Sequence, residues 1–136
     1  MISKTKIVIA FILFLIPSSI FAADWVKTSA NKTGDVFYYD KESLKIVGKE
    51  VFFLALTDYV EPSPWGDLSS VNYNKFHCEL GTVTFLAQSY YSLPMGNGEK
   101  TNSSNINKTS KLDLNSNNIL NYFYELFCND EFLQNN

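Results

Sequence analysis

The sequence of 136 residues contains no arginine, one histidine and two cysteines. Its 11 basic residues are therefore all lysines, and they are spread along the chain without forming a basic cluster. Because nucleic-acid-binding proteins gather lysine and arginine on one surface, this distribution predicts no nucleic-acid partner. The formal net charge of −3 likewise makes an anionic membrane surface a poor partner.

The single histidine, His77, limits the catalytic chemistry that the chain can offer. A hydrolase triad would have to use it, but no G-x-S-x-G motif surrounds Ser69 or Ser70. A metal site would need more ligands, and in a strand the side chains of His77 and Cys78 point to opposite faces. The sequence therefore predicts no catalytic, cofactor-binding or metal-binding residues.

Three aspartates stand where strands are expected to end or turns to begin: Asp40, Asp58 and Asp67. Carboxylates at such positions bond nearby backbone amides, and aspartate is common there for that reason. We interpret all three as turn residues rather than as catalytic acids.

Residues 1–22 have the composition of a secretory signal peptide. Lysines precede an apolar run over residues 7–16, and Ala22 and Ala23 supply small residues for cleavage. The alternative, a membrane anchor, would need an apolar stretch of roughly 20 residues. No cysteine lies near the expected cut after Ala22, so no lipid anchor is expected. We expect residues 23–136 to form one exported domain without a transmembrane span, located in the periplasm, outside the cell or at its surface.

The two cysteines, Cys78 and Cys128, are predicted to form one disulfide, because an exported protein matures in an oxidising compartment. The bond would close a loop of about 50 residues. In the chain-entropy model such a loop contributes roughly 4 kcal/mol to stability.

Hydrophobic patterning predicts an α+β fold, with an antiparallel sheet of about five or six strands and one C-terminal helix packed on one face. Gly48-Lys49 separates two apolar runs and indicates a hairpin turn. Residues 50–59 are apolar on both faces, which is typical of a central strand. A change of phase near Asn74-Lys75 predicts a β-bulge. The expected strands cover residues 25–26, 35–40, 44–47, 50–59, 70–80 and 82–91.

The helix is expected over residues 116–128, where apolar side chains recur at spacings of three and four. Ser116 is the expected N-cap, since its hydroxyl can accept from an amide of the first turn. A bond between Cys78 and Cys128 would clip this helix to the sheet.

Two segments are predicted to be loops. Pro62 and Pro64 prevent regular pairing in residues 61–67. Residues 92–115 are rich in Gly, Asn, Ser, Thr and Lys, and we expect them to form a mobile polar loop. Within the first loop, Trp65 is a candidate partner-binding residue, because exposed tryptophans often anchor interfaces. The alternative is that Trp65 folds back onto the core.

Several short motifs follow one another along the chain. They are Trp25-Val26, Phe37 to Asp40 with Ser43-Leu44, Val51 to Leu56 with Asp58-Tyr59, Ser70 leading to Phe76-His77-Cys78, Tyr91, Gly98 and a terminal helix ending at Cys128. Taken in this order, they resemble the surface-adhesin protein E family of bacterial exported proteins, and the resemblance covers essentially the whole mature chain. It implies an antiparallel sheet whose C-terminal helix is held on the concave side by the disulfide, and a non-catalytic binding protein. It assigns no ligand-binding residue.

The expected function is therefore that of an exported, non-catalytic binding module, an adhesin for host extracellular-matrix or serum proteins or a binder of a periplasmic protein. The alternative is a small periplasmic enzyme inhibitor, or an enzyme of unknown substrate. An inhibitor would need a rigid exposed loop, and Glu61–Asp67 is the candidate.

Overall fold

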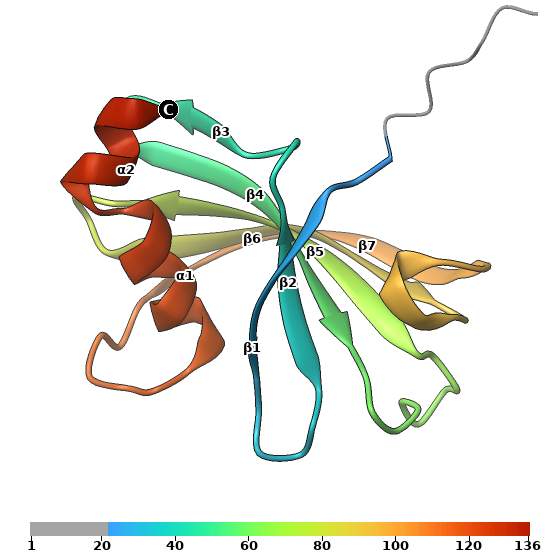
Figure 1. Cartoon of the computed structure of the whole chain (residues 1–136). Coiled ribbons are helices and arrows are strands. Elements are labelled where there is room, and N and C mark those ends of the chain that lie inside the picture. The colour runs from blue at the N-terminus through green and yellow to red at the C-terminus, as the bar shows by residue number, and fades with distance from the viewer. Residues whose placement is uncertain (1–21) are drawn as a thin grey trace, which may run out of the picture.

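The computed structural model describes residues 22–136, which form a seven-stranded antiparallel sheet and two short C-terminal helices (Figure 1). The predicted signal peptide lies outside the described residues, apart from Ala22. The elements in chain order are β1 (Trp25–Ala30), β2 (Val36–Asp40), β3 (Lys45–Val47), β4 (Glu50–Asp58), β5 (Ser69–His77), β6 (Thr82–Tyr91), the 3₁₀ turn η1 (Pro94–Gly96), β7 (Lys100–Lys111), α1 (Ile119–Phe127) and α2 (Asp130–Asn135).

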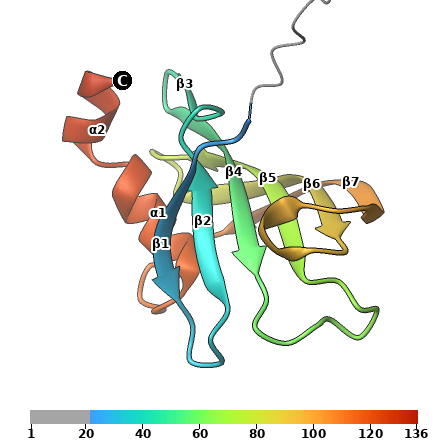
Figure 2. The ribbon, with the colours of Figure 1, turned by 45° about the vertical axis from the view of Figure 1, so that its right-hand side comes forward.

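The strands run in the order β1-β2-β4-β5-β6-β7, which Figure 2 shows side by side. The short strand β3 pairs with residues 50–52 of β4, and β2 pairs with residues 55–58. Since β5 occupies the whole other edge of β4, β2 and β3 follow one another along a single edge. The predicted hairpin joins β3 to β4, and Gly48 with φ of 60° supplies the left-handed position of a II′-type turn.

The central position predicted for residues 50–59 is confirmed, because β4 has neighbours on both edges and buried side chains on both faces. Phe53 points to the face that carries the helices, and Leu56 points to the opposite face. Both side chains are 0% exposed. Burial on both sides explains why the stretch is continuously apolar rather than alternating.

The helix α1 packs on the sheet as predicted, but it begins later than expected. Its N-cap is Asn118, whose side-chain oxygen accepts from the amide of Asn121 at 3.0 Å, so the prediction of Ser116 was wrong. Ser116 instead accepts through its backbone carbonyl from the side chain of Asn121. A second helix, α2, follows α1, although only one C-terminal helix was expected, and Asn129 caps it by accepting from the amide of Phe132.

The core lies between α1 and the sheet. Phe123 and Phe127 are buried on the inner face of the helix, with ring centroids 5.4 and 5.0 Å from that of Phe53. The predicted disulfide between Cys78 and Cys128 is present, with a Cα–Cα separation of 5.3 Å. It joins the turn after β5 to the end of α1, and therefore fixes the last turn of the helix over the sheet.

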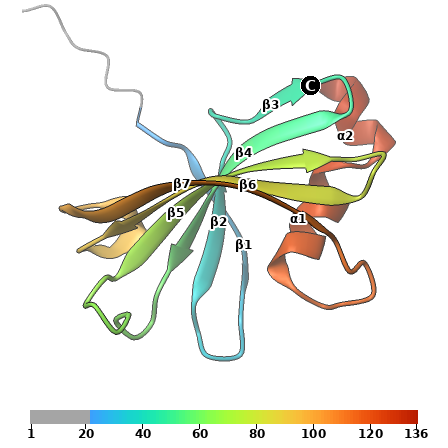
Figure 3. The same ribbon diagram turned by 180° about the vertical axis from the view of Figure 1, so that it is seen from behind.

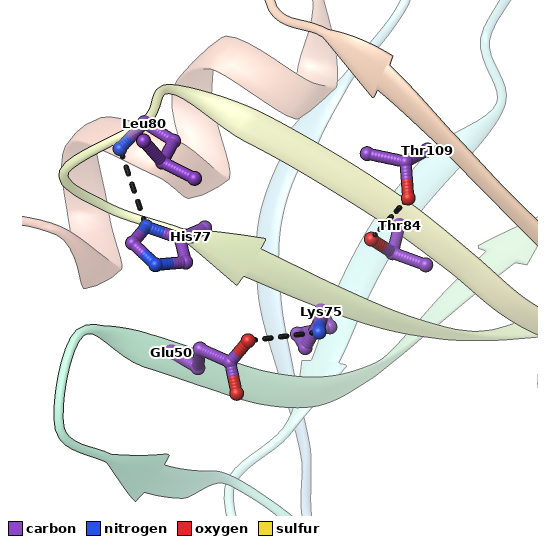
Figure 4. A network of polar contacts seen from close by, with 6 residues as sticks. All are labelled: Glu50, Lys75, His77, Leu80, Thr84 and Thr109. Carbon is purple, nitrogen blue, oxygen red and sulfur yellow. Dashed lines mark hydrogen bonds and ion pairs between the residues drawn. The ribbon is translucent and has the colours of Figure 1, made fainter.

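Residues 92–115 do not form a loop throughout, which corrects the prediction. They contain η1 and β7, a strand of 12 residues that pairs with β6 along its length. The side-chain hydroxyls of Thr84 and Thr109 also meet across this pair at 2.9 Å (Figure 4). Ile106 is the one apolar side chain of β7, and it is exposed. The strand forms without burying apolar side chains of its own, because backbone hydrogen bonds to β6 hold it and an outermost strand need not bury either face.

The turn η1 covers the sheet face opposite to the helices, at the opposite end of the sheet (Figures 1 and 3). An ideal Cβ built on Gly96 would lie 3.4 Å from the side chains of both Leu56 and Val71. Ser69 fixes the turn by donating to the carbonyl of Leu93 at 2.7 Å and accepting from the amide of Gly96 at 2.9 Å. Gly98 allows the following bend, because a Cβ there would lie 2.4 Å from the Ser92 hydroxyl.

A bulge is present beside the predicted position near Asn74, but it lies on the neighbouring strand β6 and not on β5. The register between β5 and β6 shifts between Tyr73 and Asn74, and the extra residue, Leu86, belongs to β6. A second irregularity lies opposite on β7, where Asn107 has a φ of 50°. Bulges twist an edge strand away from further pairing, and charged lysines on an edge also oppose it. Two of the three lysines of β7 stand at its ends. Both features protect this exposed edge against adding another strand.

Candidate binding surface

The sheet face that carries the helices changes character along its strands. Near α1 it presents Val51, Phe53 and Phe76, which are fully buried. Beyond Ala55 the same face becomes polar and neutral. The strand register places seven residues there, which we call the open polar half: Thr57, Ser70, Asn72, Gln88, Tyr90, Asn102 and Ser104.

Both helices lie at the other end of the sheet from the open polar half (Figures 1 and 3). The side chain of Tyr59 reaches Ser70 at the base of this surface. The Tyr59 hydroxyl donates to the Ser70 hydroxyl at 2.9 Å. Burial raises the pKa of Tyr59 above its ordinary value of 10.0, and the hydrogen bond to Ser70 offsets part of that rise. Tyr59 is therefore a neutral, hydrogen-bonded wall at neutral pH.

The loop between β4 and β5 holds Trp65 at the rim of this surface. Trp65 is 84% exposed, so the alternative that it folds back onto the core is wrong. The predicted loop over residues 61–67 is confirmed. It closes on itself, because the Ser63 amide donates to the Asp67 carbonyl and the Gly66 amide donates to the Ser63 carbonyl, both at 2.9 Å.

The Ser63 side chain reinforces this turn. Its hydroxyl donates to the Asp67 carboxylate at 3.1 Å, and it accepts from the amides of Trp65 and Asp67. The other oxygen of the same carboxylate accepts from the hydroxyl of Thr101 on β7. Asp67 is only 3% exposed. The turn that carries the indole is thus tied to the edge strand through a buried carboxylate, which holds it in place.

A pocket of about 390 Å³ lies at this junction. Three segments far apart in the sequence meet there: the loop before β5, the end of β6 and the start of β7. Its lining residues are Trp65, Asp67, Tyr90, Thr101 and Asn102. Sequence reasoning identified Trp65 and missed the rest, because Tyr90 and Asn102 become neighbours only through the pairing of β6 with β7.

A larger groove of about 600 Å³ lies elsewhere, between the β1–β2 hairpin and the start of α1. Nothing in the sequence pattern indicated it. It is lined by residues that include Asn31, Phe37, Asn118, Ile119 and Tyr122. Tyr122 is 44% exposed, which makes it a second exposed aromatic residue, at a distance from Trp65 in the fold.

The aspartates interpreted as turn residues are confirmed in that role. Asp40 accepts from the amides of Asp24 at 2.8 Å and Glu42 at 3.1 Å. Asp58 accepts from the amide of Met95 at 2.8 Å and so holds η1. Their oxygens are used by backbone donors near strand ends, which is the usual reason for aspartate at such positions.

His77 also has a local role. Its Nδ1 accepts from the amide of Leu80 at 3.2 Å in the turn after β5, close to the ion pair of Glu50 with Lys75 at 2.8 Å (Figure 4). Ser69 and Ser70 start β5 and His77 ends it, so the strand holds the serines and the histidine at opposite ends. Within residues 22–136 no group of three or more His, Cys, Asp or Glu side chains could hold a metal ion. The same part of the chain contains no helix long and apolar enough to cross a membrane.

Comparison with known proteins matches residues 25–129 to the family model for surface-adhesin protein E. The solved structures of Haemophilus influenzae protein E have the same fold. Crystal form II matches with a TM-score of 0.56 and 21% identity, covering 84% of this chain and 94% of that chain. The selenomethionine form matches with a TM-score of 0.54 and 20% identity, covering 79% and 92%. A third structure gives 0.53 and 19%, covering 81% and 96%. No curated protein matches.

Proposed function

Because the chain belongs to the surface-adhesin protein E family, we propose that it is an exported binding module whose open polar half, with Trp65 at its rim, contacts a protein partner. The partner class that the family suggests is a host extracellular-matrix or serum protein, and a periplasmic protein is the other candidate. The observation that carries the proposal is the exposed indole, held on a hydrogen-bonded turn beside a pocket.

The physical support is that an exposed tryptophan adds little to folding stability but offers a large contact area to a partner. The indole of Trp65 is 84% exposed. The Ser63–Asp67 turn and the bond from Thr101 fix its backbone before binding. A surface that is already ordered loses less conformational entropy on association.

We also infer that the chain acts without catalysis. What supports this is the use of its side chains: His77 accepts from a turn amide, and Asp40, Asp58 and Asp67 accept from backbone amides or hydroxyls. No residue pair among these has the arrangement of a nucleophile and its base. A broad hydrolase screen of the purified domain checks this inference, and turnover that disappears in His77→Ala would overturn it.

Export is part of the same proposal. We expect cleavage after Ala22, so the protein recovered from a bacterial periplasm should have the intact mass of residues 23–136 with one disulfide. An uncleaved N-terminus or a lipid adduct would contradict it.

The binding proposal is tested with immobilised extracellular-matrix and serum proteins. The wild type, Trp65→Ala and Tyr122→Ala are compared by surface plasmon resonance, with the thermal unfolding midpoint of each variant measured in parallel. Loss of about 2 kcal/mol of binding free energy only in Trp65→Ala is expected. Loss only in Tyr122→Ala would move the binding site to the groove beside α1, and no binding by the wild type at micromolar concentration would remove the proposal.

A second candidate, an inhibitor of a periplasmic enzyme, is favoured by one observation. The loop that contains Trp65 is exposed, contains Pro62 and Pro64, and is held by the hydrogen bonds of Ser63. Rigid exposed loops of this kind insert into enzyme clefts with little ordering cost. Inhibition of a protease in a periplasmic extract, relieved by Trp65→Ala, would favour this candidate over adhesion.

A further inference from the structure

We propose that the pocket beside Trp65 binds a neutral glycan, and that the glycan of a glycoprotein is the group that the module recognises. This inference rests on the proposed function, since it names the chemistry that the same surface takes. It follows from the lining of the pocket, from the absence of usable charge there, and from the continuation of the same chemistry along the sheet.

The lining supplies hydroxyl and amide groups. Tyr90 carries a hydroxyl, and Asn102 carries a side-chain amide that offers both a donor and an acceptor. The Thr101 hydroxyl donates its proton to Asp67, so its oxygen is left to accept. Thr101 and Asn102 are exposed, while Tyr90 is half-buried. Sugar hydroxyls both donate and accept, so they need partners of this mixed kind. A ligand with only one kind of hydrogen-bonding group would leave part of the lining unsatisfied.

The charges of the pocket favour a neutral ligand. None of the lining residues is a lysine, so no cation is available there to pair with a phosphate or carboxylate. The one carboxylate, that of Asp67, is 3% exposed and accepts from the hydroxyls of Ser63 and Thr101 on its two oxygens. It is therefore used within the protein and offers no free oxygen to a cationic ligand.

Trp65 supplies the apolar part of such a site. The face of an indole ring is electronegative, and the C–H groups on one side of a sugar ring carry slight positive charge, so the two stack. An indole that is 84% exposed at the rim of a pocket of about 390 Å³ can cover one face of a sugar whose hydroxyls point to Tyr90 and Asn102. Pockets of this size, with one aromatic wall and a few placed polar groups, are typical of small-ligand sites.

The same chemistry continues along the sheet. Tyr90 pairs with Asn102, and two residues further on the same face Gln88 pairs with Ser104. Asn72 lies opposite Gln88 on the next strand. A row of amides and hydroxyls therefore leads away from the pocket, and Lys100 is the one charged residue that lines the hollow beside Gln88 and Ser104. The proposed site extends along this row from one sugar to a short oligosaccharide.

The test uses the purified domain of residues 23–136 with its disulfide intact. The probes are an array of neutral mannose-, galactose- and N-acetylglucosamine-terminated oligosaccharides and their sialylated counterparts. The best neutral oligosaccharide is then titrated by calorimetry into the wild type, Trp65→Ala, Asn102→Ala and the control Tyr122→Ala. Matrix and serum glycoproteins are captured in parallel, before and after enzymatic removal of their glycans.

We expect neutral glycans to bind and sialylation of the bound sugar to give no gain. Trp65→Ala should weaken the affinity about 30-fold, and Asn102→Ala roughly 3- to 10-fold, while Tyr122→Ala should leave it unchanged. Glycoprotein capture should fall when the glycans are removed and should be competed by the free oligosaccharide.

Other outcomes distinguish failure of the glycan site from failure of the proposed protein-binding function. Glycoprotein capture that survives removal of the glycans, with no binding on the array, overturns the glycan site and leaves the proposed function standing. Glycan binding that Trp65→Ala does not change also overturns the site. Glycan binding without capture of any intact glycoprotein supports the glycan site and removes the proposed protein partner. No binding of either probe overturns both.

Discussion

Two halves of the helix-bearing face lie on the same strands but differ in what packs on them: the covered half, under α1, and the open polar half. In the covered half Phe53 and Phe76 are fully buried, 4.8 Å apart between ring centroids, under Phe123 and Phe127 of α1. From Phe76 back toward the start of β5, the same face carries Asn72 and then Ser70. The alternation of side chains along a strand decides which face each one occupies. Whether a helix can pack on that face depends on how apolar its side chains are.

Under the proposed function, the covered half stabilises the fold and the open polar half binds the partner. Apolar contacts, the disulfide and the Tyr124 hydroxyl, which donates to the carbonyl of Cys78, all lie in the covered half. The exposed indole and the neutral polar lining lie in the other half. Changes in the covered half should therefore lower the free energy of unfolding and leave binding by the folded protein intact. Changes in the open polar half should weaken binding and leave the free energy of unfolding nearly unchanged.

The largest effect is expected from Phe53→Ala, which leaves a cavity among Phe76, Phe123 and Phe127. Large-to-small changes of a buried phenylalanine destabilise by about 3–5 kcal/mol. Urea unfolding measures this loss. The neighbouring Phe52 is the matched control, because it lies on the opposite face and is only half-buried. A loss for Phe52→Ala as large as that for Phe53→Ala would contradict the assignment of the core.

Removing the disulfide should come next. The double variant Cys78→Ala with Cys128→Ala opens a closed loop with a sequence separation of 50. The expected loss is about 2–4 kcal/mol, since the unfolded chain regains loop entropy and the end of α1 loses its clip to the sheet. Differential scanning calorimetry against the oxidised wild type checks it. An unchanged midpoint would show that α1 is held by its apolar face alone.

A smaller effect is expected from Tyr124→Phe, which removes the hydroxyl that donates to the carbonyl of Cys78. The half-buried carbonyl loses its partner at the cost of about 1 kcal/mol, while the ring remains packed on Phe76, with 5.7 Å between ring centroids. Tyr122→Phe is the control from the same helix, because Tyr122 is exposed. Equal unfolding midpoints for the two variants would count against this bond.

The smallest effect concerns pH. The pKa of Tyr59 is raised in the folded protein, chiefly by burial, so the folded protein holds the phenolic proton more tightly than the unfolded chain does. Stability from this group is fully present below pH 10 and falls as the pH rises through the folded pKa. Urea midpoints measured from pH 8.5 to 11 should fall more steeply in the wild type than in Tyr59→Phe. Parallel pH profiles would contradict the raised pKa.

Much of this fold could be predicted from the sequence. The continuous apolar run of residues 50–59 indicates a strand buried on both faces, and the three- and four-residue spacing in residues 116–128 indicates a helix with one buried face. The disulfide followed from two cysteines in an exported chain. β7 could not be predicted, since its polar residues carry no period and the partner strand β6 supplies its stabilisation through the backbone. The helix start was misplaced because Ser116 and Asn118 can both cap, and the choice depends on what each side chain meets in the fold.

The candidate site was less predictable than the fold. Pro64 and Gly66 around Trp65 indicate a loop, but they do not say whether the indole turns inward or outward. Asp67 could be recognised as a turn residue, whereas its bond to Thr101 depends on where β7 pairs. The pocket can be located only when the register of β6 with β7 is known, because its lining comes from three separate segments. No pattern within one segment could therefore predict it.

The most direct test of the separation is to measure affinity and stability together on Trp65→Ala. We expect the affinity for the captured matrix or serum protein to fall about 30-fold, while the free energy of unfolding stays within about 0.5 kcal/mol of the wild type. A lowered unfolding free energy with unchanged affinity would contradict it, because Trp65 would then belong to the folded core and not to the binding surface.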